Sequence, residues 1–472
     1  MVFSSPIFLF LFLPIALIGS FVFRKNLCNL FLLAMSLAFY AWGEPKFVFV
    51  MIGVVLLDYF FGLWVDHEKK RERSTRLPIV LTVIVNVGLL FIFKYLNFTT
   101  QNLHTLIGDS IPVTQIALPI GISFFTFQAM SYVFDVNAGT GRVQRNPLNV
   151  LLYVSFFPQL IAGPIVRYQT VADEINDRRV TLDDFSYGIE RFVIGLAKKA
   201  ILANTLGISV DYCYGLVGTD ALTTGLAWLA AIGYSLQLYY DFSGYSDMAI
   251  GLGRMLGFHF LENFDYPYMS KSVGEFWRRW HISMGTWFRD YVYIPLGGSR
   301  SGKAAHIIFN LFVVWLLTGI WHGANWTFIV WGLWHFLWIA FERITDIPKR
   351  CGKIGGAAYR VVTLLAVVLG WVLFRSDNLG NAWVMIEAMF GGAIAFSSET
   401  TVTIWADILI TMVVAAICAI PVDVVVFRKK TRFIVAAKMI SIMMLFVICL
   451  AFVCTAKYDP FILTFDMEKQ HE

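Results

Sequence analysis

One histidine lies inside a long apolar stretch of the chain. His322 belongs to the nearly neutral run LLTGIWHGANWTFIVWGLWHF, where Trp321 and Trp326 flank it. A histidine in such surroundings is expected to be neutral at physiological pH. A neutral imidazole can accept a proton from an attacking hydroxyl. Gly323 and Ala324 break helical continuity beside it, which lets a substrate approach closely. The alternative is a histidine that only hydrogen-bonds neighbouring helices, but ionisable residues inside apolar spans favour a functional interpretation.

Two other histidines lie near aromatic residues. His281 stands between Trp280 and Ile282, and it is as compatible with stacking on tryptophan at a membrane interface as with a substrate role. His335 follows His322 by 13 positions, a rotation of about 220° at 100° per residue. If one straight helix held both histidines, they would not share a face. We therefore interpret His335 as a packing residue.

Polar side chains interrupt the apolar run that covers residues 222–245. The segment 234–247 (YSLQLYYDFSGYSD) carries Gln237, Asp241, Ser243 and Asp247 at the end of that run. Carboxylates in a membrane are costly unless they are paired or wetted. Arg254 is a plausible local partner for them. The alternative is that these residues form a polar wall of a substrate tunnel, and the sequence leaves both interpretations open.

A glycine-rich basic segment, GGSRSGK, covers residues 297–303. Backbone N–H groups together with cations can hold the phosphates of a coenzyme, and Arg278, Arg279 and Arg289 lie upstream of this segment. An ordinary basic turn on the cytoplasmic side is the favoured interpretation. The chain has no GxSxG, P-loop lysine or HExxH motif, and an H-x4-D box beginning at His281 would need aspartate where Thr286 stands.

The composition requires a membrane environment. The chain is 58% hydrophobic and only 15% charged, with a mean hydropathy of +0.67, whereas soluble domains are about 25% charged. Apolar stretches long enough to cross the bilayer recur throughout. The sequence therefore predicts an all-α, polytopic membrane bundle of about 11–12 spans. The apolar segments lie at 5–23, 27–42, 46–63, 77–97, 115–134, 188–206, 222–245, 305–321, 325–341, 358–374, 403–427 and 433–455.

We expect one integral-membrane domain over residues 1–472, with core segments at 115–341 and peripheral spans at 1–114 and 342–472. The run 147–163 is broken by prolines, which predicts a re-entrant hairpin. The N-terminus lacks a basic region before its first apolar run, so that run is expected to be a retained span. The six cysteines form no CxxC pair, and we expect neither disulfides nor a bound metal.

Basic residues in the loops predict the orientation. Residues 66–76 carry five basic side chains, residues 428–432 carry four, and the loop around 278–303 is basic as well. The positive-inside rule places all three segments in the cytoplasm and residues 375–402 outside, with both termini outside. The region 256–304 combines Trp, Tyr and Arg, which is typical of helices lying at the membrane interface. The net charge of +5 therefore reflects topology and not nucleic-acid binding.

Long motifs of this chain resemble one enzyme family, the membrane-bound O-acyltransferases, and within it the bacterial alginate O-acetyltransferase membrane subunits. The motifs are LPIGISFFTFQAMSYVFDV (118–136), YVSFFPQLIAGPIVR (153–167), QLYYDFSGYSDMAIGLGRMLGF (237–258), FWRRWHISMGTWFRDYVYIPLGG (276–298) and GIWHGANWTFIVWGLWH (319–335). The opening MVFSSPIFLFLFLP (1–14) is similar to that subgroup too.

The resemblance implies a helical bundle around a tunnel in a bacterial inner membrane. It implies that His322, in the WHG segment, and His281, in the RRWH segment, are the catalytic histidines. The donor would be a cytoplasmic thioester, acetyl-CoA, with no bound cofactor. The acetyl group would reach an exported polysaccharide through periplasmic or extracellular acetyltransferase partner proteins. Gln237, Asp241, Ser243, Asp247, Trp280, Arg278, Arg279 and Asn325 are the candidate tunnel and donor-binding residues.

Alternatives remain at this stage. Related branches of the family acylate peptidoglycan, cellulose or teichoic acid, and the shared motifs do not reveal which polymer is acetylated. A secondary transporter also has broken helices and polar residues at mid-membrane, although no inverted repeat is visible here. A catalytically silent scaffold is the third possibility, and in that case His322 would be dispensable.

Overall fold

The computed structural model describes residues 1–472 except 301, 392–398, 422–431 and 456–472. The described residues form helices joined by turns, with no β-strand among them, which confirms the predicted all-α class. The chain divides into two compact units. Among the described residues, unit 1 comprises 1–196 and 245–262, and unit 2 comprises 197–244 and 263–455.

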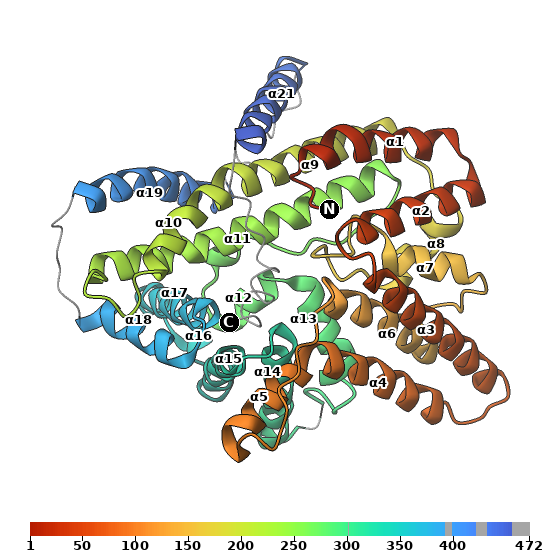
Figure 1. Ribbon diagram of the computed structural model, residues 1–472, viewed down its shortest axis with the longest axis horizontal. Coiled ribbons are helices and arrows are strands. Elements are labelled where there is room, and N and C mark those ends of the chain that lie inside the picture. The colour runs from red at the N-terminus through yellow and green to blue at the C-terminus, as the bar shows by residue number, and fades with distance from the viewer. Residues whose placement is uncertain (301, 392–398, 422–431, 456–472) are drawn as a thin grey trace. The chain divides into compact units, whose positions relative to one another are not determined.

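Unit 1 is built mainly from the N-terminal helices (Figure 1). They are α1 (Leu13–Val22), α2 (Lys25–Gly43), α3 (Phe47–Lys70), α4 (Arg76–Leu90), α5 (Leu96–Ile107), α6 (Ile122–Ala138), α7 (Pro147–Ser155), α8 (Tyr168–Asn176) and α9 (Leu182–Ala197). Two π-helical segments, η1 (Phe8–Phe12) and η2 (Phe91–Tyr95), adjoin α1 and α4. Helix α6 packs against α3 and α4, and a Cβ at Gly62 of α3 would lie 2.6 Å from the ring of Tyr132.

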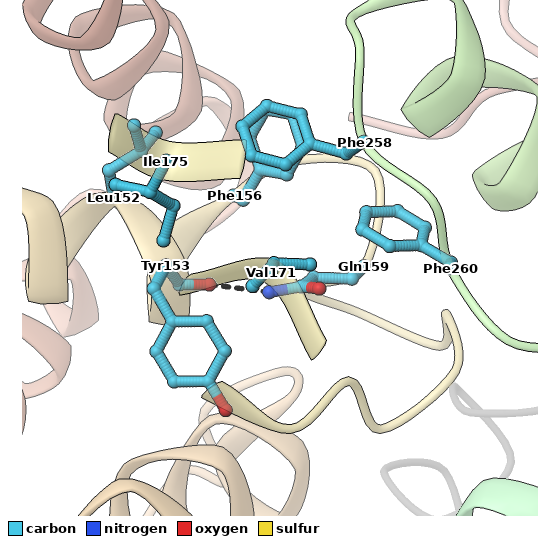
Figure 2. A pocket seen from close by; sticks show the side chains of 8 residues that line it. All are labelled: Leu152, Tyr153, Phe156, Gln159, Val171, Ile175, Phe258 and Phe260. Atoms are coloured by element: carbon cyan, nitrogen blue, oxygen red, sulfur yellow. Dashed lines mark hydrogen bonds between the residues drawn. The ribbon is translucent and has the colours of Figure 1, made fainter. Parts of the chain in front are cut away.

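Helix α7 ends where the sequence predicts a break. It stops at Ser155, and residues 156–167 continue as turns and irregular chain through Pro158 and Pro164. Beside this segment lies a small, partly open pocket. Figure 2 shows its lining, in which the Gln159 side-chain amide donates to the carbonyl of Tyr153 and the remaining side chains are apolar or aromatic. None of the predicted site residues lines this pocket.

Unit 2 contains most of the segments that the sequence marks as functional. Its helices are α10 (Asn204–Tyr214), most of α11 (Thr224–Met255), α12 (Val273–Arg279), α13 (Ile282–Phe288), α14 (Ala304–His322), α15 (Trp326–Thr345), α16 (Ile347–Arg350), α17 (Lys353–Arg375), α18 (Leu379–Gly391), α19 (Glu399–Cys418) and α21 (Arg432–Thr455). The π-helical segments η3 (Lys198–Ala203) and η5 (Arg289–Tyr293) and the 3-10 turn η4 (Pro267–Met269) complete it.

Helices α14 and α15 form a tight hairpin, which Figure 1 shows as two neighbouring ribbons. Two glycines allow the close approach: a Cβ at Gly319 would lie 2.6 Å from the carbonyl oxygen of Phe328, and one at Gly332 would lie 2.5 Å from that of Trp315. Helix α14 ends at His322, so the predicted break at Gly323 and Ala324 is confirmed.

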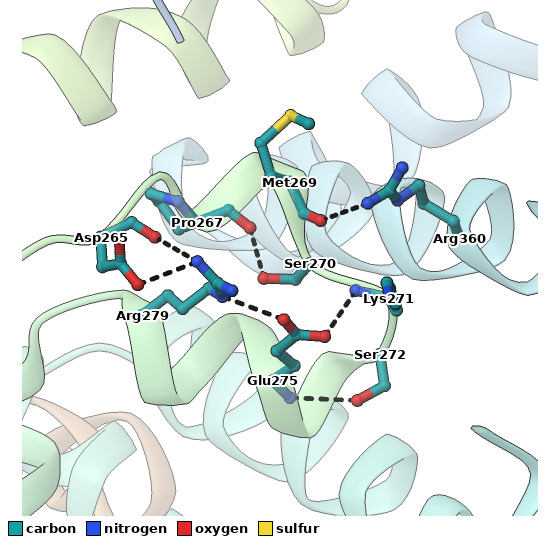
Figure 3. A network of polar contacts seen from close by, with 9 residues as sticks. All are labelled: Asp265, Pro267, Met269, Ser270, Lys271, Ser272, Glu275, Arg279 and Arg360. Atoms are coloured by element: carbon teal, nitrogen blue, oxygen red, sulfur yellow. Dashed lines mark hydrogen bonds and ion pairs between the residues drawn. The ribbon is translucent and has the colours of Figure 1, made fainter. Parts of the chain in front are cut away.

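Helix α12 is held at both ends by side chains. Ser272 caps its start by accepting from the N–H of Glu275 at 3.0 Å, and the Glu275 carboxylate accepts from the N–H of Lys271. Arg279 bonds both Glu275 and Asp265, as Figure 3 shows. From α15, the Glu342 carboxylate accepts the N–H groups of Val273 at 2.6 Å and Gly274 at 2.9 Å. These contacts fix the short helix that precedes His281.

Six helical stretches among the described residues are long and apolar enough to cross a membrane: 47–70, 76–107, 182–214, 304–322, 354–375 and 436–455. Shorter apolar helices lie at 8–22, 27–43 and 408–418. A polytopic helical bundle is therefore confirmed, while the larger number of about 11–12 crossings stays a prediction. The predicted basic segment 428–432, apart from residue 432, and part of the segment 375–402 lie outside the described residues.

Candidate active site

His322 is the last residue of α14, and its imidazole is surrounded by aromatic rings. Its ring centroid lies 4.9 Å from Trp321, 4.8 Å from Trp331 of α15 and 5.2 Å from Phe374 of α17. The Nε2 atom is buried. The helix ends here because Gly323 adopts an extended conformation and Asn325 begins α15, accepting from the N–H of Thr327 at 3.0 Å. The end of one helix therefore presents His322 to the start of the next.

His281 occupies the bend between α12 and α13. Its backbone is left-handed, with φ +47° and ψ +53°, a conformation that a residue with a side chain adopts at an energetic cost. The side chain is 1% exposed and packs edge-on against Phe242 of α11 at 4.7 Å. This bend lies outside the candidate membrane spans. Burial lowers the pKa of His281 to about 3, so its imidazole is neutral throughout the physiological range.

The imidazole rings of the two predicted catalytic histidines both lie beside the indole ring of Trp321. The centroid of Trp321 lies 6.1 Å from that of His281 and 4.9 Å from that of His322. These two histidines are separated by 41 positions of sequence, yet unit 2 brings them to the same indole ring. A buried, aromatic-walled site with two imidazoles has the composition expected of an acid–base centre.

His335 lies closer to this site than the sequence indicates. It is fully buried, and its ring lies 5.2 Å from Trp331, which also contacts His322, and 4.9 Å from Trp277. The prediction that the two histidines face apart assumed one straight helix. That assumption is wrong because α14 ends at His322 and the hairpin returns α15 alongside it. The packing role of His335 agrees with its surroundings.

The polar residues of α11 lie in the middle of a helix and not at its end, because α11 continues to Met255. Asp241 forms an ion pair with Lys199 of η3 at 2.6 Å, with side-chain exposures of 3% and 2%. Gln237 and Ser243 are buried as well, and Gln237 Oε1 and Ser243 Oγ have no hydrogen-bond partner among the described residues. Such buried polar atoms are compatible with a wetted polar wall.

Asp247 belongs to unit 1, where Arg191 holds it. Arg191 donates from Nε at 3.0 Å and from Nη2 at 2.7 Å to one carboxylate oxygen, and it also pairs with Glu262. Arg254, which the sequence offers as one possible local partner of the α11 carboxylates, pairs with Asp184 at 2.9 Å instead. The cations come from α9 and η3 because helices that pack side by side supply partners distant in sequence.

Three of the remaining four candidates have partners within the protein, and Arg278 has no ion-pair partner among the described residues. Trp280 is 4% exposed and stacks on Phe276 at 5.5 Å, and Arg279 bonds two carboxylates. Arg278 is exposed and forms no ion pair among the described residues. Asn325 caps α15 and donates to the carbonyl of Asp377 at 2.8 Å. Of these four residues, Arg278 alone is placed to contact an anion from solvent.

The glycine-rich segment forms a turn with backbone conformations that favour glycine. Gly297 and Gly298 have φ +101° and +55°, and His306 and Asn310 bond the carbonyls of Leu296 and Gly298. Upstream, Arg289 pairs with the adjacent Asp290 at 2.6 Å.

Four residues around the predicted site were not identified from the sequence: Lys199, which pairs with Asp241, Asn263, whose Oδ1 lies 3.2 Å from Nδ1 of His281, Trp331, which lies beside His322, and Glu342, which holds the start of α12. Only Lys199 carried a signal, because it is a lysine within the predicted span 188–206. No cluster of three or more His, Cys, Asp or Glu residues suited to a metal occurs in the described part of the chain.

Comparison with known proteins identifies the class. Residues 125–346 match the model of the membrane-bound O-acyltransferase family, a range close to the predicted core of 115–341. The chain is 46% identical over 394 residues to the probable alginate O-acetylase AlgI of Pseudomonas aeruginosa, covering 83% of this chain and 75% of that protein. It is 34% identical to the peptidoglycan O-acetyltransferase of Helicobacter pylori, covering 83% and 80%.

A more distant similarity, 32% identity over 231 residues, links it to the teichoic acid D-alanyltransferase of Bacillus subtilis, covering 46% of this chain and 56% of that one. The chain belongs to the membrane-bound O-acyltransferase family. It is accordingly an acyltransferase and a multi-pass membrane protein.

Proposed function

We propose that this protein O-acetylates an exported polysaccharide, alginate or a similar polymer, from the inner membrane of a bacterium. The similarity to probable alginate O-acetylases over 83% of the chain supports the polymer class. The observation that supports acid–base catalysis is that His322 and His281 both lie beside Trp321. The donor is cytoplasmic acetyl-CoA, and the acceptor approaches from the opposite face, either directly or through a partner acetyltransferase protein.

The chemistry requires one base and two substrates. His322 takes the proton of the acceptor hydroxyl as its oxygen attacks the thioester carbonyl, so that a C–O bond forms. The C–S bond then breaks, and the proton passes from the imidazolium to the leaving thiolate. The aromatic walls exclude water, which protects the thioester from hydrolysis. The coenzyme itself stays in the cytoplasm because its phosphates are too costly to desolvate in lipid.

The test uses two substitutions of one residue. His322→Ala and His322→Gln are each expected to abolish acetylation of the exported polymer, while the protein remains inserted and stable. Glutamine keeps hydrogen-bonding ability and roughly the size of imidazole, but it is not a base near neutral pH. A general base contributes about 10²–10⁴-fold, so the acetyl content of polymer from a complemented deletion strain separates the two roles. Near-normal acetylation with His322→Gln contradicts the catalytic assignment.

A second polymer has a specific observation in its favour. The similarity to a peptidoglycan O-acetyltransferase covers 83% of this chain. In that case the deletion strain loses acetyl groups from its peptidoglycan and not from its secreted polysaccharide. Acetyl analysis of both polymers from one strain decides between them.

A further inference from the structure

Asn263 lies against the imidazole of His281. Both side chains are buried, at 0% and 1% exposure. Asn263 Oδ1 accepts from the backbone N–H of Ser283 at 3.2 Å and from the Ser283 hydroxyl at 2.8 Å. The same oxygen lies 3.2 Å from Nδ1 of His281. Three neighbouring groups therefore converge on one amide oxygen.

The contacts decide which atom of the amide faces the histidine. A backbone N–H can only donate, so the Asn263 atom that meets Ser283 N must be the oxygen and not the amide nitrogen. That oxygen has no proton to offer Nδ1. Nδ1 must therefore carry the proton and donate it to Asn263, and the second ring nitrogen, Nε2, keeps a lone pair. Ser283 Oγ, 3.4 Å from Nδ1, also presents an oxygen to this N–H group.

Asn263 also supports the backbone around the histidine. Its carbonyl accepts from the N–H of Ile282 at 3.0 Å, so its two oxygens bind the first two N–H groups of α13. The left-handed conformation of His281 persists because its surroundings hold it there. One asparagine thus fixes both the strained backbone and the ring orientation.

Protonation of His281 would remove the lone pair of Nε2. The surroundings of the ring disfavour this protonation. Phe242 of α11, Trp321 of α14, Asn263 and Ser283 contact the ring. None of these four side chains is charged. Burial alone accounts for the lowered pKa of His281.

We propose that Asn263 is a positioning residue that fixes the Nδ1–H tautomer of His281, so that Nε2 accepts a hydrogen bond from an O–H or N–H group of the substrates. This proposal rests on the proposed function. In the Nδ1–H tautomer, Nε2 of His281 cannot donate a hydrogen bond to the oxyanion of the tetrahedral intermediate, because that would require a proton on Nε2. Proton transfer stays with His322.

The test compares Asn263→Ala with Asn263→Asp in inverted membrane vesicles from polymer-producing cells supplied with radiolabelled acetyl-CoA. With alanine at position 263, the His281 ring is no longer held in the Nδ1–H tautomer. Acetyl transfer to polymer should then fall on the order of tenfold, because one buried hydrogen bond is lost. Aspartate still accepts from Nδ1–H and should restore transfer at neutral pH. Its negative charge raises the pKa of His281, so the acidic limb of the pH profile should move to higher pH. An oxyanion donor would instead gain activity at low pH.

The dependence of the rate on substrate identifies the bound group. A rise in the KM for acetyl-CoA indicates an amide N–H of the coenzyme arm, whereas a fall in kcat at unchanged KM indicates the acceptor hydroxyl. Asn146→Asp is the matched control, because Asn146 caps α7 by accepting from Leu148 N at 3.0 Å. Its pH profile should stay unchanged.

The outcomes separate this proposal from the function on which it rests. Full activity of Asn263→Ala beside an inactive His281→Ala overturns the role of Asn263 and leaves the function standing. Full activity of both His281→Ala and His322→Ala overturns the function. If Asn263→Ala fails to insert into the membrane, the pH profile of Asn263→Asp tests the proposal instead. An acidic limb that does not shift contradicts the proposal.

Discussion

The indole of Trp321 has an imidazole beside it from each of two separate segments, α14 and the α12–α13 bend. The sequence marks His322 as a candidate because an ionisable residue stands in an apolar run. His281 is ambiguous there, since an interfacial histidine beside tryptophan has ordinary explanations. What the sequence cannot supply is their proximity, which depends on how α12, α14, α15 and α17 pack around Trp331 and Trp371.

Adjacent arginines on α12 are expected to behave differently. Arg278→Gln should raise the apparent KM for acetyl-CoA, because an exposed cation that loses a charge-assisted contact to phosphate forfeits on the order of 1.5–3 kcal/mol of binding. Arg279→Gln should instead lower the melting temperature, since Arg279 bonds Asp265 and Glu275. Donor titrations and thermal unfolding of both variants in the same detergent measure this. An unchanged KM for Arg278→Gln supports an ordinary basic loop.

Partners of buried charges were the weakest part of the residue-level prediction. Arg254 was one candidate partner for the α11 carboxylates because it is near them in sequence. Lys199 precedes Asp241 by 42 positions and Arg191 precedes Asp247 by 56. Pairing across neighbouring helices depends on their rotation about their own axes, which hydropathy alone does not define.

At the scale of elements, the positions of breaks were predictable and the lengths of helices were not. Glycine and proline marked the ends of α14 and α7 correctly. The end of α11 was placed about ten residues too early, because its polar residues resemble a loop. Once Asp241 and Asp247 are paired with cations, the helix continues without exposing an unpaired charge to an apolar environment.

The close packing of α14 against α15 at Gly319 can be tested by substitution. Gly319→Ala places a methyl group 2.6 Å from the Phe328 carbonyl oxygen, so the helices must separate. Overpacking of this kind costs about 1–3 kcal/mol, and it displaces His322 from Trp331. We expect a lower melting temperature together with reduced polymer acetylation.

The matched control for that variant is Gly53→Ala in α3, where nothing lies within 4 Å of the new methyl group. It should leave acetylation intact, and helix propensity favours alanine by about 1 kcal/mol. Equal effects of the two substitutions would show that the close crossing is not needed.

At the scale of the whole molecule, composition was enough to predict a helical membrane protein. The number of crossings is harder, because the apolar helical stretches at 8–22 and 408–418 do not have the length of a full span. Whether a short helix crosses, tilts or stops depends on what covers its ends.

The predicted orientation is open to direct measurement. In a variant without the six native cysteines, Lys70→Cys should be shielded from an impermeant thiol reagent in intact cells, because the positive-inside rule places residues 66–76 in the cytoplasm. A cysteine at 430, outside the described residues, should be shielded as well. Asn378→Cys, at an exposed site, should be labelled. Labelling of positions 70 and 430 from outside would reverse the orientation.

The buried pair of Lys199 and Asp241 has a consequence for biosynthesis. The ribosome completes the candidate span 182–214 before it reaches Asp241, so the lysine leaves the ribosome without its carboxylate. A lysine at the centre of a lone membrane helix costs about 2.5–3.5 kcal/mol on insertion scales. The ion pair with Asp241 offsets that cost once α11 lies beside the lysine, so we expect the two segments to leave the insertion machinery together.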